Sequence, residues 1–139
     1  MLVVAVIVSR YFQRDRPAAS SAPAVPPAGP RTEAQELVAR MWGIYDKVDD
    51  TSNEEWELAE ELGARATKLE PLNAEAWAAY ANVISMPYIF GIDSSPERVA
   101  RATKSAERAV SIAPESVQTR LALANVRRRC SGLFHQAKF

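Results

Sequence analysis

Hydrophobic residues recur at intervals of three and four in five stretches of the chain, and this spacing predicts amphipathic helices. Each stretch begins after a residue suited to cap a helix: Thr32, Ser52, Asn73, Ser95 and Ser116. Gln or Glu follows the first two caps three residues later, as in a capping box. Pro71 and Pro114 should end the second and fourth helices. No stretch shows the period-two alternation of a strand, so the predicted fold is all-α.

Each predicted helix carries one apolar face that is expected to lie in the core. In the last helix this face is expected to comprise Val117, Leu121 and Ala124, and it can extend to Val126. Pro87 should stop or kink the third helix. The large apolar side chains of residues 88–90, directly after this proline, either extend the helix over the core or form a loop that contacts a partner.

Small and apolar residues of the second predicted helix recur in the fourth at a constant offset of 43. The matched residues are Ala59, Gly63, Ala66, Leu69 and Pro71, against Ala102, Ala106, Ala109, Ile112 and Pro114. Six residues past each proline the next helix presents Trp77 or Arg120, and three further on it presents Tyr80 or Leu123. Small residues let antiparallel helices approach closely, and the proline sets the turn into the next helix.

This spacing resembles the tetratricopeptide repeat, a helix pair with conserved aromatic and small positions and a late proline. The residues that carry the resemblance are Trp77, Tyr80, Ala81, Ile84, Ala102, Ala106, Ala109 and Pro114. The resemblance covers about residues 34–139, with a repeat about nine residues longer than the usual 34 and the extra residues near 86–94. It implies a TPR-like α-solenoid of antiparallel helix pairs, about five helices in all, that binds a protein or peptide on its concave face. The alternative is an unrelated array of alanine-rich helical hairpins.

The residues before the helices divide into an apolar stub (1–12) and a Pro/Ala-rich linker (13–31), ahead of a helical domain (32–139). The apolar run in the stub is too short to span a membrane, which takes about 20 residues. It is the end of a longer transmembrane helix, an atypical signal or anchor segment, or simply an apolar terminus. In the first case the protein is expected to be membrane-anchored through its N-terminus, and otherwise cytoplasmic.

The composition excludes several kinds of functional site. The chain has one cysteine, Cys130, and one histidine, His135, which rules out an internal disulfide and a multi-histidine metal site. Its five glycines are scattered, so there is no glycine-rich phosphate loop. Because no nucleophile–base pair or metal-ligand cluster stands out, we expect no cofactor and no catalytic activity.

The charges balance overall, with 17 cations and 17 carboxylates, but they are unevenly placed. Residues 31–72 carry a net charge of −6 and residues 96–139 a net charge of +6, a dipole that bears on association. The glutamates at 54–61 are expected to form a solvated face, with Glu61 paired to Arg65. The last helix should lack a partner on one side, so we expect fraying from about Val126 or salt-sensitive self-association.

Asn82 and Asn125 occupy equivalent places in the two repeats, each one turn after Ala78 or Leu121. In the family that the repeat resembles, this side of the first helix lines the concave surface. An asparagine there can both donate to and accept from an extended peptide backbone. These four residues are therefore candidates for binding a peptide.

Arg128 and Arg129 are further candidates, because a basic cluster suits an acidic protein partner. No aromatic platform accompanies them, so nucleic-acid binding is not expected. The leading hypothesis is a non-catalytic protein–protein interaction module. The alternative is a structural or sensory repeat domain of a larger membrane-anchored signalling enzyme, of kinase or cyclase type, whose catalytic part lies outside this chain.

Overall fold

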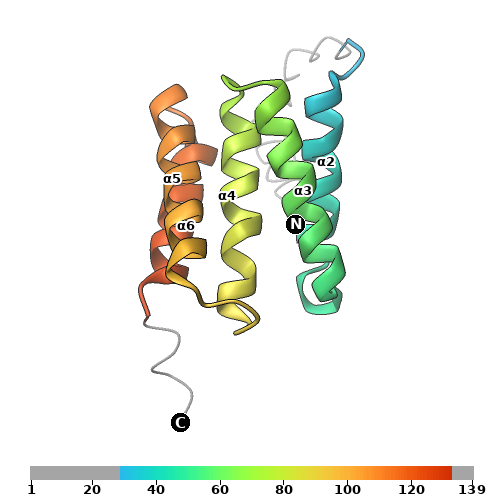
Figure 1. Ribbon diagram of the computed structural model, residues 1–139. Helices are drawn as coiled ribbons and strands as arrows, with labels where there is room; N and C mark the ends of the chain where they lie inside the picture. The colour runs from blue at the N-terminus through green and yellow to red at the C-terminus, as the bar shows by residue number, and fades with distance from the viewer. Residues whose placement is uncertain (1–28, 133–139) are drawn as a thin grey trace, which may run out of the picture. The chain divides into compact units, whose positions relative to one another are not determined.

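The computed structural model describes residues 29–132, and within them the chain forms five α-helices and no strand (Figure 1). The helices are α2 (Glu33–Tyr45), α3 (Asn53–Leu69), α4 (Ala74–Ile89), α5 (Pro96–Ile112) and α6 (Val117–Cys130), with a 3-10 turn at Val48–Asp50. The prediction of an all-α fold is confirmed. The predicted stub, most of the predicted linker and residues 133–139 lie outside the described residues.

Side-chain caps determine where the first helices begin. Thr32 and Ser52 each accept a hydrogen bond from the backbone N–H three residues on. The side chain at that position, Gln35 or Glu55, accepts a bond from the cap in return. Both predicted capping boxes are therefore formed, and Asn73 caps α4 by accepting from a backbone N–H in its first turn.

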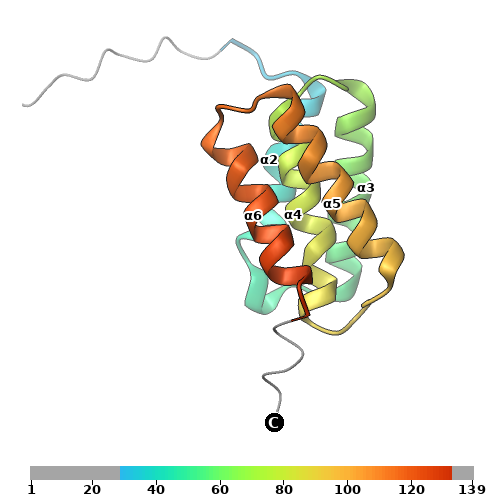
Figure 2. The same ribbon diagram turned by 90° about the vertical axis from the view of Figure 1, so that its left-hand side faces the viewer.

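The helices are arranged in two layers (Figures 1 and 2). In one layer α2 packs against α4 and α4 against α6, while α3 and α5 pack on the other side of α4. Successive helices run antiparallel because the connections between them are short. As a result α4 lies at the centre and contacts each of the other four helices.

Small residues allow this close packing around α4. Its buried apolar residues before Pro87 are Ala76, Ala78, Ala79, Ala81, Val83, Ile84 and Met86. Gly63 of α3 faces it: a Cβ added there would lie 2.4 Å from Cδ2 of Tyr80 and 2.9 Å from Sδ of Met41. Any side chain at position 63 would therefore push α3 away from both neighbouring helices.

Pro87 does not end α4, which continues to Ile89. The helix closes two residues later: the N–H of Ile92 donates to the carbonyl of Pro87 at 2.9 Å, and that of Gly91 donates to the carbonyl of Tyr88 at 3.2 Å. Gly91 has a φ of +68°, which glycine adopts without strain. Of the two effects expected of the proline, a stop is therefore excluded, and the predicted alternative that residues 88–90 extend the helix holds at Ile89, which packs on the core.

The buried face of α6 differs from the predicted one except at Val126, which is buried as expected. Val117 and Leu121 are 65% and 56% exposed, and Ala124 is exposed as well. The buried residues are Thr119, Ala122, Val126 and Arg129. They stand 43 positions after Ala76, Ala79, Val83 and Met86, which form a core with α2 and α3. Thus α6 buries the face that meets the preceding repeat. Its other face, which corresponds to the face that α4 turns toward α5, has no covering helix within residues 29–132.

Candidate functional site

A hollow of about 220 Å³ opens on the layer formed by α2, α4 and α6, and we call it the amide pocket. It is lined by Trp42, Tyr45, Glu75, Ala78, Asn82, Gln118, Leu121 and Asn125. The three lining residues from α6 stand 43 positions after the three from α4, so these six residues occupy equivalent positions in two repeats. Each set has the spacing i, i+3 and i+7, which places its members on one helix face. Four of the predicted site residues are therefore brought together here.

The two equivalent asparagines contact each other across the α4–α6 interface. Nδ2 of Asn125 donates to Oδ1 of Asn82 at 3.4 Å, and Nδ2 of Asn82 donates to the carbonyl of Ala78 at 3.1 Å. Asn82 is only 5% exposed, whereas Asn125 is half-buried. Within the described part of the chain, Oδ1 of Asn125 accepts no hydrogen bond. Asn82 thus makes internal contacts, and Asn125 is the amide of the pair that a ligand can reach.

Arg129 lies beneath the amide pocket and does not line it. Its side chain is 6% exposed, and its Nη1 donates to Oδ1 of Asn82 at 3.2 Å and to Oγ of Ser85 at 3.0 Å. Its Nη2 donates to the hydroxyl of Tyr45, whose ring centre is 5.5 Å from the guanidinium carbon. The sequence suggests that Arg129 contacts an acidic partner. The structure instead buries Arg129, which donates hydrogen bonds to Asn82, Ser85 and Tyr45. Its neighbour Arg128 is exposed and also stands outside the pocket lining.

The buried guanidinium has no acidic counter-ion among residues 29–132, and its Nε has no hydrogen-bond partner there. A cation in this position makes the electrostatic potential above it positive, because buried charges are weakly screened. At the other end of the pocket, Glu75 lies in the first turn of α4. The amide pocket is therefore polarised, with a carboxylate at one end and the charge of Arg129 beneath the other.

Aromatic side chains of α2 form the remaining wall of the amide pocket. Trp42 and Tyr45 pack edge to face with ring centres 5.3 Å apart, and Tyr45 packs in turn against the buried Trp56 at 6.5 Å. Such contacts hold the rings in defined orientations. The wall therefore offers apolar surface beside the amides.

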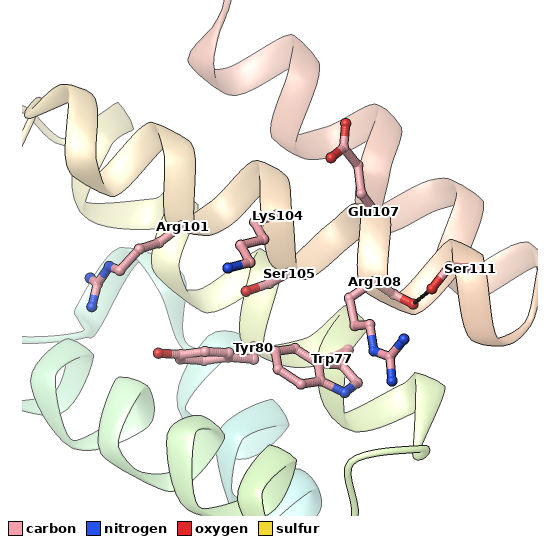
Figure 3. A pocket seen from close by; sticks show the side chains of 8 residues that line it. All are labelled: Trp77, Tyr80, Arg101, Lys104, Ser105, Glu107, Arg108 and Ser111. Atoms are coloured by element: carbon pink, nitrogen blue, oxygen red, sulfur yellow. Dashed lines mark hydrogen bonds between the residues drawn. The ribbon is translucent and has the colours of Figure 1, made fainter.

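A second hollow, of about 600 Å³, lies between α4 and α5 (Figure 3). Trp77 and Tyr80 of α4 lie side by side on one wall, and α5 forms the other with three cations, Arg101, Lys104 and Arg108, and one carboxylate, Glu107. We call this hollow the basic cavity. Tyr80 is half-buried, and this burial raises the pKa of its phenol. No local sequence pattern marks this cavity, because it forms only where two helices meet.

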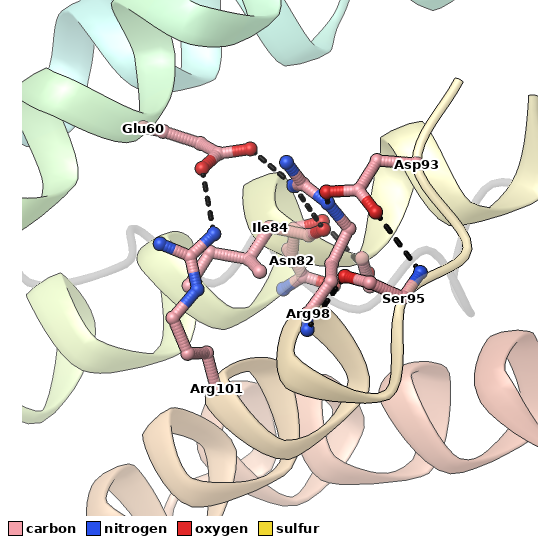
Figure 4. A network of polar contacts seen from close by, with 8 residues as sticks. Glu60, Asn82, Ile84, Asp93, Ser95, Arg98 and Arg101 are labelled. Carbon is pink, nitrogen blue, oxygen red and sulfur yellow. Dashed lines mark hydrogen bonds and ion pairs between the residues drawn. The ribbon is translucent and has the colours of Figure 1, made fainter.

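Polar contacts fasten the α4–α5 connection to α3 (Figure 4). Arg98 donates to Glu60, to the carbonyl of Ile84 at 3.0 Å and to Asp93 at 2.7 Å. Arg101 donates to the other oxygen of Glu60 at 3.0 Å. Together these bonds join α3, α4, α5 and the connection.

The hydrogen bonds from Arg98 and Arg101 affect two carboxylates, Asp93 and Glu60. The hydrogen bond from Arg98, together with the N–H of Ser95, lowers the pKa of Asp93 to about 2. Glu54, Glu57 and Glu61 are exposed, as predicted for most of the glutamates at 54–61, whereas the Glu60 side chain is only 16% exposed. Arg65 pairs with Glu33 of α2 rather than with its expected helix neighbour.

Comparison of the chain with protein-family models, with curated proteins and with solved structures finds no match. Among the described residues, no three histidine, cysteine or acidic side chains gather to hold a metal ion. None of the helices in residues 29–132 has the length and hydropathy needed to cross a membrane.

Proposed function

We propose that this chain is a non-catalytic interaction module that binds an extended segment of another protein in the amide pocket. The observation that carries the proposal is that equivalent positions of two repeats line one hollow, opposite an aromatic wall. A peptide backbone presents a donor and an acceptor at each residue, and a side-chain amide matches both. The resemblance of the repeat to the tetratricopeptide family supports the same use of this face.

The lining residues indicate how the segment would be held. Oδ1 of Asn125 is accessible to a backbone N–H, and Leu121 offers an exposed apolar surface one turn earlier on α6. Trp42 lies on the facing wall. A side chain of the bound segment can therefore pack between leucine and tryptophan while its backbone bonds to the asparagine.

The polarity of the pocket indicates the chemistry of the segment. Glu75 and Asn82 are seven residues apart on α4, about 10 Å along the helix, a length that about three extended residues span. A basic side chain suits the end at Glu75, and an acidic side chain suits the end above Arg129. The preferred sequence is therefore basic, apolar and acidic in that order along the pocket.

Selection of peptides from a random display library on the full chain tests this proposal. The Asn125→Ala variant should bind the selected peptides about two- to tenfold more weakly than the wild type, because one hydrogen bond is lost. Leu121→Glu should cost more than about tenfold, because it places a charge on the apolar contact. Leu69→Glu, at an exposed leucine on α3 outside the pocket, is the matched control and should bind as the wild type does. Failure to enrich any peptide, or equal affinity for all three variants, would contradict the proposal.

A further inference from the structure

Two helices of the chain carry opposite charges at the same spacing. On α3, Glu54, Glu57 and Glu61 are exposed at positions i, i+3 and i+7. On α5, Arg101, Lys104 and Arg108 are exposed at positions i, i+3 and i+7. Residues with this spacing share one face of a helix. Each helix therefore presents a row of like charges that is complementary to the row on the other.

Most of these charges have no ionic partner within the described part of the chain. Glu57, Glu61, Lys104 and Arg108 take part in none of its ion pairs. Arg101 does pair with Glu60, and its side chain nevertheless remains 51% exposed. The two rows are therefore available for contacts outside the chain.

The row on α5 borders the basic cavity, whose opposite wall is aromatic (Figure 3). An occupant of this cavity needs an apolar side chain to cover Trp77 and Tyr80 and carboxylates to meet the cations. On α3 the exposed Leu58 lies between the acidic residues of the row, one turn after Glu54 and three residues before Glu61. We call Leu58 with its three glutamates the acidic face.

We propose that the acidic face of one copy of this chain docks in the basic cavity of a second copy. Both surfaces belong to the same chain, so every copy offers one of each. The amide pocket is built from α2, α4 and α6 and shares no lining residue with the basic cavity. Self-association through α3 and α5 is therefore independent of peptide binding in the amide pocket. An experiment can contradict one of the two proposals without contradicting the other.

Sedimentation velocity of the full chain tests the association itself. At about 50 mM salt, the weight-average mass should rise between about 10 µM and 1 mM protein. At about 500 mM salt, the dissociation constant should increase about tenfold or more, because exposed ion pairs are screened. A chain that stays monomeric throughout this range at low salt would overturn the proposal.

A charge exchange tests which surfaces meet. Lys104→Glu with Arg108→Glu, and separately Glu57→Lys with Glu61→Lys, should each weaken self-association about tenfold or more. Mixing these two variants should restore association, because each altered surface then meets an altered partner of opposite charge. The matched control is Arg40→Glu with Arg127→Glu, which changes the net charge as much as the first variant at exposed sites elsewhere.

All substituted side chains are exposed, and circular dichroism should show wild-type helicity in each variant. Leu58→Glu gives a second test that leaves both rows of charge in place, and it should weaken association as well. Association that survives either charge reversal, that is not restored by mixing, or that the control disrupts equally would overturn the proposal.

Discussion

Nδ2 of Asn125 donates to Oδ1 of Asn82 at 3.4 Å, and the two residues stand at equivalent positions 43 residues apart. The repeat thus places one amide directly against its counterpart. Their surroundings differ because α4 packs against four helices, whereas α6 packs mainly against α4 and α5 within the described residues. Asn82 is consequently buried over Arg129, and Asn125 faces the amide pocket.

Asn82→Ala should lower the free energy of unfolding by roughly 1–3 kcal/mol, because it removes an acceptor from the buried guanidinium of Arg129. Asn125→Ala should change it by less than about 0.5 kcal/mol, since its side chain reaches solvent. Urea unfolding followed by circular dichroism measures both. Equal losses in the two variants would show that the asparagines do not have the separate roles described here.

Arg129→Met should leave the free energy of unfolding unchanged or raise it. Met86 occupies the equivalent position in α4, and replacing a buried charge by an apolar side chain of similar volume is often neutral or stabilising. Arg129→Ala is the comparison, and the cavity it leaves should lower the free energy of unfolding by about 2 kcal/mol or more. If the methionine variant loses as much as the alanine variant, the guanidinium contributes net stability.

Gly63→Ala should lower the free energy of unfolding by about 1–3 kcal/mol or more. Its Cβ would lie within 3 Å of both Tyr80 and Met41, so the packing of α3 would have to shift. Gly43→Ala on α2 is the matched control: its Cβ would meet nothing within 4 Å, and it should raise the free energy of unfolding by up to about 1 kcal/mol. Thermal or urea unfolding that ranks the two variants in the opposite order would contradict this packing.

The helices could be predicted from sequence because their signals are local. The capping boxes at Thr32 and Ser52 depend on residues three apart, and the apolar spacing of each helix on residues within a few turns. Which face of α6 is buried is not local, because Leu121 would be covered or exposed according to the helices present beside it. Local sequence likewise leaves open whether Pro87 stops or only kinks α4, and the helix continues past it to Ile89.

The site could be predicted only in part. The offset of 43 identified Asn82 and Asn125 as equivalent, and the structure places them in one pocket. The same offset relates Arg129 to the buried Met86, a signal that could have indicated its burial. The partnership of Glu60 with Arg98 joins residues 38 apart on different helices, and no spacing rule within one helix reveals it.

The ion pair of Asp93 with Arg98 should make the free energy of unfolding depend on pH. Because the pKa of Asp93 falls from its usual 3.8 to about 2 in the folded state, the ionised group stabilises the fold above about pH 4. This contribution is lost as the pH falls through about 2, where the folded carboxylate takes up its proton. Asp93→Asn should therefore unfold with a weaker pH dependence between about pH 4 and 2. An NMR titration that finds the Asp93 carboxyl at its ordinary pKa would contradict the contact.

The three tryptophans of the chain report separately on its three environments. Trp42 lines the amide pocket, Trp77 lines the basic cavity and Trp56 is buried in the core. Their indole N–H signals can be followed in one nitrogen–proton correlation spectrum while a display-selected peptide is added to the full chain at a constant protein concentration. Peptide binding in the amide pocket predicts that the Trp42 signal shifts with saturation while the Trp56 and Trp77 signals stay in place. A saturable shift of Trp77 with Trp42 unmoved would contradict the proposed function.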